Sequence, residues 1–300
     1  MPHAEIRSFA QFIARYLPGN IQKITVNAGF TCPNRDGSKG SGGCIYCNNA
    51  AFSPSYSLKG GSITRQIEEG KRFFSRKHAD MHYVAYFQSF TSTNGPVDKI
   101  IGLIHEALSQ PDVKGVIIGT RPDCMPDDLL IELQAIARTH FVMMEYGAET
   151  ANDTTLALVN RCHCWADTVE AVQRTHAAGI PTGLHLILGL PGETRADMMH
   201  TIDCVNRLPV DTLKFHQLQL VRGTRLASMA ERGEIEMENF SAESYADLCC
   251  GILQRLRQDI IVERFVSQSP SSLLIAPRWG LKSHRFMDLL RQRLNTRHGG

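Results

Sequence analysis

The chain has 300 residues, of which 43% are hydrophobic, and a formal net charge of only +2 at pH 7. This apolar content can bury a full core, and the length suits two domains or one α/β barrel of about 250 residues. The small net charge gives no strong electrostatic case for binding nucleic acid. With no apolar run of about 18 residues and no secretory leader at its start, the sequence predicts a cytoplasmic protein without a membrane partner.

Six short segments rich in Val, Ile, Leu, Phe and Tyr alternate with helical patterns along the chain. The predicted strands are Lys23–Ala28, His82–Gln88, Gly115–Gly119, Phe141–Tyr146, Thr182–Leu188 and Thr212–Leu220. We expect helices to begin at Pro126 and Thr194, and Gly179 to end the helix before Pro181. Strand–helix alternation predicts an α/β fold, either a doubly wound sheet or a barrel, with its active site at the carboxyl ends of the strands.

A glycine-rich loop with three cysteines, Cys32, Cys44 and Cys47, follows the first predicted strand. Three thiolates are one fewer than the four ligands of a structural zinc site or an ordinary iron–sulfur cluster. The spacing therefore favours a metal centre with one open coordination position. Two other interpretations stand beside it: a redox Cys-x-x-Cys pair with Cys32 as a bystander, and a zinc knuckle completed by a distant histidine.

Polar residues follow the later strands as well. They stand in the segments 88–93, 119–124, 145–150 and 189–193. Singly, each has an ordinary explanation, since Gly-Leu-Pro-Gly makes common turns and Arg121 with Asp123 could form a simple ion pair. The carboxyl ends of parallel strands meet at one edge, so together these segments predict a pocket beside the cysteine loop.

The ordered motifs resemble the radical SAM superfamily. They are the cysteine loop, Tyr86-Phe87-Gln88, Gly-Thr-Arg-Pro-Asp-Cys at 119–124, the segment from Glu149 to Arg161, and the segment from His185 to Glu193. Within the superfamily the chain resembles the YhcC-type proteins, whose cluster loop is similar to that of the Elongator catalytic subunit. Eleven residues separate Cys32 from Cys44, where the commonest motif has three, and this is how the YhcC-type loop looks.

The resemblance implies a [4Fe–4S] cluster on Cys32, Cys44 and Cys47, with S-adenosylmethionine (SAM) on the fourth iron. Reductive cleavage of SAM would give a 5′-deoxyadenosyl radical that abstracts hydrogen from a substrate. The implied fold is a partial (β/α)6 TIM-like barrel with a short basic C-terminal extension. We assign residues 1–20 to an N-terminal segment, 21–258 to the radical SAM core and 259–300 to the extension. A reducing partner such as flavodoxin or ferredoxin is expected.

The resemblance also suggests residues that contact SAM or substrate. The expected SAM contacts are Glu149, Arg161, His185, Lys59, Gly189 and Pro191. Lys59 could equally be a solvated loop charge, and His185 a satisfied core residue. Substrate contacts are expected from Gln88, Arg121 and Asp123, and Cys124 is a candidate catalytic thiol unless it is packed.

The other cysteines have simpler explanations. Cys162 and Cys164 flank His163, a pattern that invites a second metal site, but the resemblance implies none. We expect Cys204, Cys249 and Cys250 to be apolar fillers.

The C-terminal tail after Pro277 is basic, with Trp279 among its arginines. Such a run is usually a solvated helical face, but it could also clamp an RNA backbone. The likeness to the Elongator subunit favours a radical SAM enzyme that acts on the C5 substituent of a tRNA wobble uridine. Alternatives are a radical SAM enzyme for a small molecule or peptide, a non-catalytic iron–sulfur redox regulator and a zinc-dependent barrel hydrolase.

Overall fold

The computed structural model describes residues 6–58, 60–74 and 81–298. Its elements in chain order are α1 (Phe9–Ile13), β1 (Asn20–Val26), η1 (Asn49–Ala51), α2 (Ser55–Leu58), α3 (Ile63–Phe74), β2 (Met81–Phe87), α4 (Val97–Leu108), β3 (Val113–Thr120), η2 (Pro122–Cys124), α5 (Asp127–Ile136), β4 (Phe141–Glu149), α6 (Asp153–Leu158), α7 (Trp165–Ala177), β5 (Thr182–Leu188), α8 (Arg195–Asn206), β6 (Thr212–Gln217), β7 (Leu220–Val221), α9 (Arg225–Glu231), α10 (Ala242–Arg255), β8 (Ile261–Arg264), β9 (Leu274–Ala276) and α11 (Ser283–His298). The labels η1 and η2 mark single-turn 3₁₀ helices.

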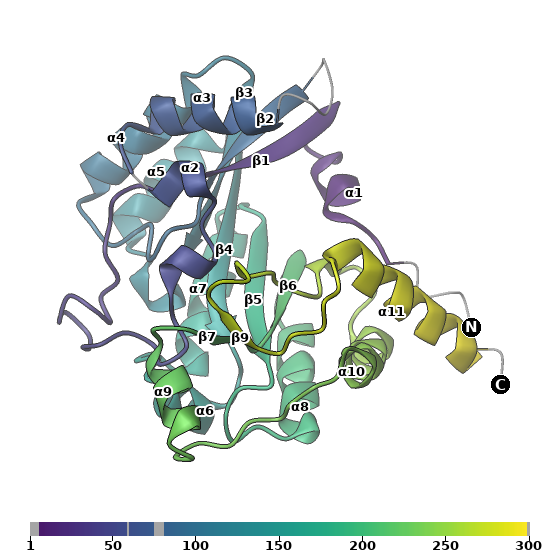
Figure 1. Ribbon diagram of the computed structural model, residues 1–300. Coiled ribbons are helices and arrows are strands. Elements are labelled where there is room, and N and C mark those ends of the chain that lie inside the picture. Colours follow the sequence, from purple (N-terminus) through teal and green to yellow (C-terminus); the bar gives the residue numbers. More distant parts are fainter. Residues whose placement is uncertain (1–5, 59, 75–80, 299–300) are drawn as a thin grey trace.

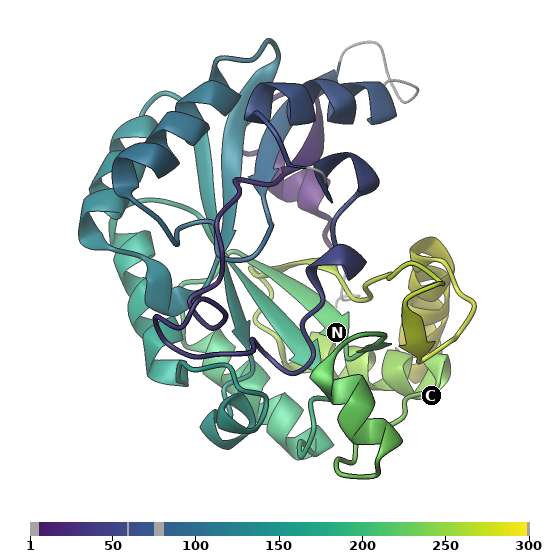
Figure 2. The ribbon, with the colours of Figure 1, turned by 60° about the vertical axis from the view of Figure 1, so that its left-hand side comes forward.

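The large sheet is parallel and has seven strands in the order β1-β2-β3-β4-β5-β6-β8. It curls into an open half-barrel whose convex face is covered by helices that include α4, α5, α7 and α8 (Figures 1 and 2). The predicted α/β fold of the radical SAM type is thus confirmed.

The sheet has one more strand than the six that were predicted. Strand β8 pairs with β6, and it lies in the segment that was assigned to the C-terminal extension. Strand β6 ends at Gln217, short of the predicted Leu220. The chain turns away there, and Leu220–Val221 pairs as β7 with β9 in a separate antiparallel sheet.

Local capping explains where several helices begin and end. Thr194 caps α8, because its hydroxyl accepts from the backbone N–H of Asp197 while the Asp197 carboxylate binds the Thr194 N–H. Gly179 follows the end of α7 with φ 73°, a conformation that costs glycine little. These two boundaries are as predicted. Pro126 is the N-cap residue of α5, directly before its first helical residue.

The inside of the half-barrel is layered. Helix α1 closes the amino end of the strands, because its Phe12 and Ile13 join an apolar layer with the strand residues Val84, Tyr86, Ile117, Phe141, Met143 and Ile261. The main core fills the space between the sheet and its outer helices. This burial of apolar area is the principal stabilising term for the fold. Because α1 seals the amino end, a ligand reaches the barrel interior from the carboxyl ends of the strands.

Helix α11 packs along α10 and buries Phe286, Leu290 and Leu294. The ring of Trp279 stacks on Phe286 at 5.9 Å between centroids, and its Nε1 donates to the Phe240 carbonyl at 2.8 Å. Trp279 is therefore part of the packing of the C-terminal region. No helix in the described part of the chain is long and apolar enough to cross a membrane.

Candidate active site

A cavity of about 190 Å³ lies at the carboxyl ends of the strands, open to the mouth of the half-barrel. It brings together eight of the residues that were predicted for the site: Cys32, Cys44, Cys47, Gln88, Arg121, Glu149, Arg161 and His185. These residues come from the cysteine loop, from β5, from the carboxyl ends of β2, β3 and β4, and, for Arg161, from the loop between α6 and α7.

The cysteine loop is fixed by backbone hydrogen bonds on both sides. Within it, the Cys47 N–H donates to the Cys44 carbonyl at 3.0 Å. Ile45 joins the loop to the rest of the barrel, since its N–H donates to Val159 at 3.1 Å and its carbonyl accepts from the Leu226 N–H at 2.9 Å. The three cysteine thiols are free, and they face one cavity.

Polar and cationic groups surround the cysteine sulfurs. The Cys44 Sγ accepts from Asn34 Nδ2 and from Arg161 Nη1, each at 3.7 Å. Burial, and next the neighbouring Cys44 thiol, raises the pKa of Cys47 to about 11, so this thiol stays protonated unless a cation offsets the burial. Iron supplies such charge, and the N–H groups around Cys44 suit a bound thiolate. The residues present therefore fit an iron–sulfur cluster.

Among the described residues, no group of three His, Cys, Asp or Glu side chains lies close enough together to hold a single metal ion. The three cysteines share a cavity without meeting at one point. A multi-iron cluster suits this spacing, because each of its irons takes one thiolate.

All three guanidinium nitrogens of Arg161 make contacts that hold it beside the cysteine loop. Its Nη2 donates to the Gly147 carbonyl at 2.6 Å and lies 3.3 Å from the Glu149 carboxylate, while its Nε donates to His163 Nε2 at 3.0 Å. The residues on either side, Asn160 and Cys162, both have φ near 57°. Backbone strain of this kind collects at functional sites.

Glu149 is also held in an unusual conformation. Strand β4 continues past its predicted end at Tyr146, and its pairing with β5 shifts register between Gly147 and Glu149. Glu149 itself has φ 67°, which re-aims its side chain into the cavity beside Arg161. Two of the residues predicted to contact SAM are therefore ion-paired neighbours on one wall of the cavity.

A buried charged layer lies at the floor of the cavity and consists of Lys23, Glu145, His185, Lys214 and Glu263, of which Glu145 and His185 line the cavity itself. Glu145 is only 1% exposed and contacts three of the other members. It accepts from Lys214 and from His185 Nε2, the latter at 2.9 Å, and lies 3.4 Å from Lys23. Lys23 also contacts Glu263 at 2.7 Å. Five strands each contribute one member.

Protonation in the charged layer follows from these contacts. Burial alone would raise the pKa of Glu145, but Lys214 and Lys23 outweigh it and hold the pKa well below its usual value. Burial also lowers the pKa of His185. The ionised Glu145 requires the proton of the neutral imidazole on Nε2, which leaves His185 Nδ1 as a hydrogen-bond acceptor.

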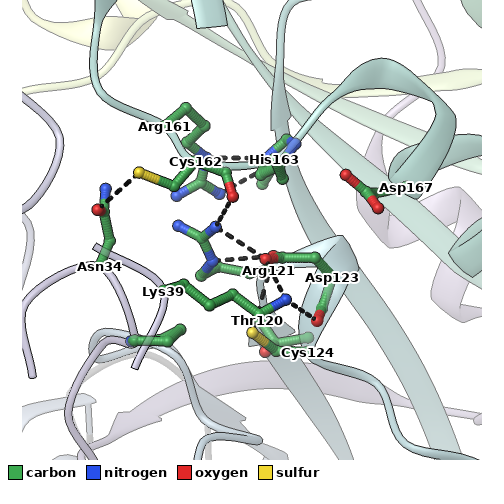
Figure 3. Close-up of polar contacts among 12 residues, drawn as sticks. Asn34, Lys39, Thr120, Arg121, Asp123, Cys124, Arg161, Cys162, His163 and Asp167 are labelled. Carbon is green, nitrogen blue, oxygen red and sulfur yellow. Dashed lines mark hydrogen bonds and ion pairs between the residues drawn. The ribbon is translucent and has the colours of Figure 1, made fainter. Parts of the chain in front are cut away.

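Arg121 and Asp123 form a second network on the wall of the cavity nearest the cysteine loop (Figure 3). Arg121 is 1% exposed, and its Nε and Nη2 both bind the Asp123 carboxylate at 2.9 Å. Lys39 of the cysteine loop also binds Asp123, at 2.7 Å, and Arg121 Nη2 donates to the Cys162 carbonyl. The Nη1 of Arg121 is buried without a hydrogen-bond partner in the described structure. It is free to donate to a ligand in the cavity.

Four predicted site residues do not line the cavity: Asp123, Cys124, Gly189 and Pro191. The carboxylate of Asp123 is taken by Arg121 and Lys39. Burial raises the pKa of Cys124 to about 11, so its thiol is not a ready nucleophile. Lys59 lies outside the described residues.

The side chains of the Cys162–Cys164 segment bind protein groups. The Cys162 Sγ lies 3.1 Å from Asn34 Oδ1 (Figure 3). Cys164 is the N-cap residue of α7, where it contacts Asp167. Burial lowers the pKa of His163 to about 3, with Arg161 adding to the effect, so its imidazole is neutral.

The sequence analysis missed two features of the site. One is Tyr46, which lies between Cys44 and Cys47 in the sequence, lines the cavity and has a buried hydroxyl without a partner in the described structure. Its position within the Cys-x-x-Cys segment was the available signal. The other is the pairing of Glu145 with Lys214, which was signalled only by charged residues inside apolar strands.

Comparison with known families agrees with this architecture. The sequence matches the Radical SAM superfamily over residues 31–205 and the Radical_SAM C-terminal domain over residues 210–296. The first match spans more than half of the chain, which therefore belongs to the radical SAM superfamily.

Individual relatives narrow the assignment. YtqA of Bacillus subtilis is 34% identical over 275 residues, which cover 92% of this chain and 85% of YtqA. YhcC of Escherichia coli is 33% identical over 277 residues, which cover 91% of this chain and 87% of YhcC. These two relatives confirm the predicted resemblance to YhcC-type proteins.

Two further similarities concern more distant proteins. A tRNA uridine(34) acetyltransferase of Methanocaldococcus infernus is 29% identical over 136 residues, which cover 43% of this chain and 25% of that protein. The structure of Elp3 from the same organism, solved with an N-terminal deletion, superposes with a TM-score of 0.67 at 15% identity. The superposition covers 94% of this chain and 64% of the Elp3 chain, and it shows a shared fold.

Proposed function

We propose that this radical SAM enzyme holds a [4Fe–4S] cluster on Cys32, Cys44 and Cys47 and uses SAM to abstract hydrogen from the C5 substituent of a tRNA wobble uridine. The observation that carries the proposal is the grouping of three free cysteine thiols, Arg161 and Glu149 around one cavity at the carboxyl ends of the strands. When bound, the cluster supplies the electron that cleaves SAM and generates the 5′-deoxyadenosyl radical.

The side chains of the cavity can meet the charges of SAM. Arg161 and the unpartnered Nη1 of Arg121 offer donors to its carboxylate, and the Glu149 carboxylate can accept from its amino group or ribose hydroxyls. His185, oriented by Glu145, presents Nδ1 as an acceptor on the cavity floor. The apolar layer beneath the charged floor excludes water from the amino end of the barrel.

The substrate class rests on a relative. The name of the acetyltransferase that matches 136 residues of this chain specifies uridine 34 of tRNA. We place the enzyme in the reducing cytoplasm, where flavodoxin or ferredoxin could supply the electron.

Anaerobic reconstitution with iron and sulfide tests the cluster assignment. Cys32→Ala, Cys44→Ala and Cys47→Ala should each lose the sulfur-to-iron charge-transfer absorbance and the cleavage of SAM under dithionite, because each thiolate is an obligatory ligand. Cys162→Ala and Cys164→Ala are matched controls that should keep their iron, since these thiols contact Asn34 and Asp167. A full cluster in any of the first three variants would contradict the assignment. A wild-type cluster without SAM cleavage would indicate a redox regulator.

The substrate is tested in a deletion strain by mass spectrometry of tRNA nucleosides. Loss of a modified wobble uridine, with accumulation of its precursor, is the expected result. An unchanged nucleoside profile would move the proposal to a small molecule or a peptide and leave the radical chemistry in place.

A further inference from the structure

Two aromatic side chains stand exposed at the rim of the cavity. Phe52 follows η1 and is 36% exposed, and Phe90 follows β2 and is 38% exposed. Both line the cavity that holds the three cysteines. A large ring at the entrance of a polar site leaves apolar area in water until a ligand covers it.

The backbone holds Phe90 in this exposed position. Its φ of 55° is a left-handed conformation that bulky side chains rarely adopt. Hydrogen bonds on both sides fix it, since the Phe90 N–H donates to Asn49 Oδ1 and the Thr91 N–H donates to the Thr31 carbonyl, each at 3.4 Å. Strain that neighbouring groups maintain in this way is typical of ligand-binding positions.

Arg35 adjoins the same rim, and Arg222 and Arg225 lie next to the cysteine loop without lining the cavity. The Arg35 guanidinium lies 5.8 Å from the centroid of the Phe90 ring. Arg222 and Arg225 are exposed at the start of α9, which lies beside the cysteine loop in Figure 1. Asn48 Nδ2 donates to the Arg222 carbonyl at 3.0 Å, which ties that turn to the loop.

The guanidinium groups of these arginines have no carboxylate partner in the described structure, and Arg35 Nη2 donates to the Cys47 carbonyl at 3.1 Å. Within the described ranges, neither Arg35 nor Arg222 nor Arg225 forms an ion pair with a carboxylate. Asp36, the acid next to Arg35, is engaged instead by Thr31, Ser38 and Asn94. The rim therefore has cations available for an anionic ligand.

We propose that Phe52, Phe90 and Arg35 at this rim, together with Arg222 and Arg225 beside the cysteine loop, bind one unstacked nucleotide of an RNA substrate. The base stacks on the phenyl rings, and the neighbouring phosphates bind the arginines. The inference rests on the proposed function for its substrate class, and it names the residues that bind the RNA. Exposed rings beside unpaired guanidinium groups match the flat base and the charged backbone of an unpaired nucleotide. A base inside a duplex cannot reach either ring.

The test measures the affinity of the cluster-loaded protein for a short anticodon stem-loop RNA with uridine at the wobble position, and for the same RNA with an abasic wobble position. Phe52→Ala and Phe90→Ala should each weaken binding of the uridine RNA about tenfold and have little effect on the abasic RNA. Phe90→Gly relieves the left-handed backbone and should behave like Phe90→Ala, which separates loss of the ring from loss of folding. Ile131→Ala removes an exposed side chain from the outer helix α5 and is the matched control.

Arg222→Gln and Arg225→Gln should weaken the binding of both RNAs alike. Each should also lower the slope of log affinity against log salt concentration by about one unit. If the wild-type protein binds neither RNA, the tRNA substrate itself is wrong. If it binds the uridine RNA but Phe52→Ala and Phe90→Ala change nothing, the proposed function stands and the assignment of the rim is overturned.

Discussion

Arg161 connects the cysteine loop to the rest of the site. Its guanidinium contacts the Cys44 sulfur, the Gly147 carbonyl and the His163 ring, and it lies within ion-pair distance of Glu149. The residue is 7% exposed, so each of these contacts is made in a poorly solvated environment where charge matters more than in water. A change at this one position should therefore affect SAM binding more than the fold.

Arg161→Gln should keep the cluster and weaken SAM binding about 10- to 100-fold, because a charge-assisted hydrogen bond contributes roughly 1.5–3 kcal/mol. Calorimetric titration of reconstituted protein with SAM measures the loss. Arg195→Gln removes an exposed arginine that pairs with Glu238 and should bind SAM like the wild type. Wild-type affinity in Arg161→Gln would remove this residue from the SAM site.

Glu193 provides a pH-dependent test of the turn after β5. Burial raises the pKa of this carboxyl from about 4.5 to about 7, although it accepts a hydrogen bond from Thr150 at 2.5 Å. Because the folded pKa lies above the unfolded one, the folded state holds its proton more tightly. The contribution of this carboxyl to the free energy of unfolding should therefore be fully present below about pH 4.5. It should be lost as the pH rises towards 7.

Glu193→Gln should remove this decline, which amounts to at most about 3 kcal/mol. Urea unfolding at pH 5 and pH 8 measures how the free energy of unfolding changes with pH in the wild type and in the variant. Glu132→Gln, on the exposed face of α5, is expected to keep the wild-type slope. The same slope in Glu193→Gln and wild type would contradict the assignment.

At the scale of elements, the apolar pattern of the sequence was enough to predict individual strands, but it did not predict how they pair. Strands β1 to β6 were found because each is a run of apolar residues between loops, but a boundary was misplaced by several residues at β1, β4 and β6. Strand β8 was missed because Ile261 and Val262 are followed at once by Glu263 and Arg264. With Ile260 before them, these residues make an apolar run of three, which is too short for a strand signal.

The contacts within the charged layer could not be predicted from such patterns. Lys214 and Glu145 are 69 residues apart in the chain and meet only because β4, β5 and β6 are neighbours in the sheet. Lys214 also donates to the Tyr86 hydroxyl at 3.2 Å and lies 3.4 Å from Glu263. Burial lowers the pKa of Lys214 to about 8, and the two carboxylates limit the decrease. Strand order must be known before these contacts can be inferred.

Lys214→Met should destabilise the protein by about 3–5 kcal/mol, because it leaves the buried Glu145 with less compensating charge. Adding Glu145→Gln should recover part of the loss, so the double variant is more stable than the sum of the single changes predicts. Urea unfolding of the four proteins in a double-mutant cycle measures the coupling. Strictly additive losses would indicate that the two side chains do not stabilise each other.

At the scale of the whole molecule, the site is assembled by the curl of the sheet and by the loops across its open end. The sequence predicted the cysteines and the polar strand ends because each follows an apolar strand directly. It did not predict that Arg161 and Glu149 are ion-paired, that Trp279 is packed against Phe286, or that Phe52 and Phe90 are exposed. These features depend on side-chain directions that only the folded chain defines.

The basic helix α11 is a second surface that could meet RNA, and charge reversal distinguishes it from the rim of the cavity. Arg285→Glu with Arg291→Glu changes two exposed side chains and leaves Phe286, Leu290 and Leu294 buried against the rest of the protein. Truncating the chain after Pro277 would instead remove that packing and unfold part of the core, so it is the poorer test. We expect the double reversal to preserve both stem-loop affinity and its salt slope, because the phosphates bind Arg222 and Arg225. If the slope falls by about one unit per reversed arginine, the RNA lies along α11 and not at the rim.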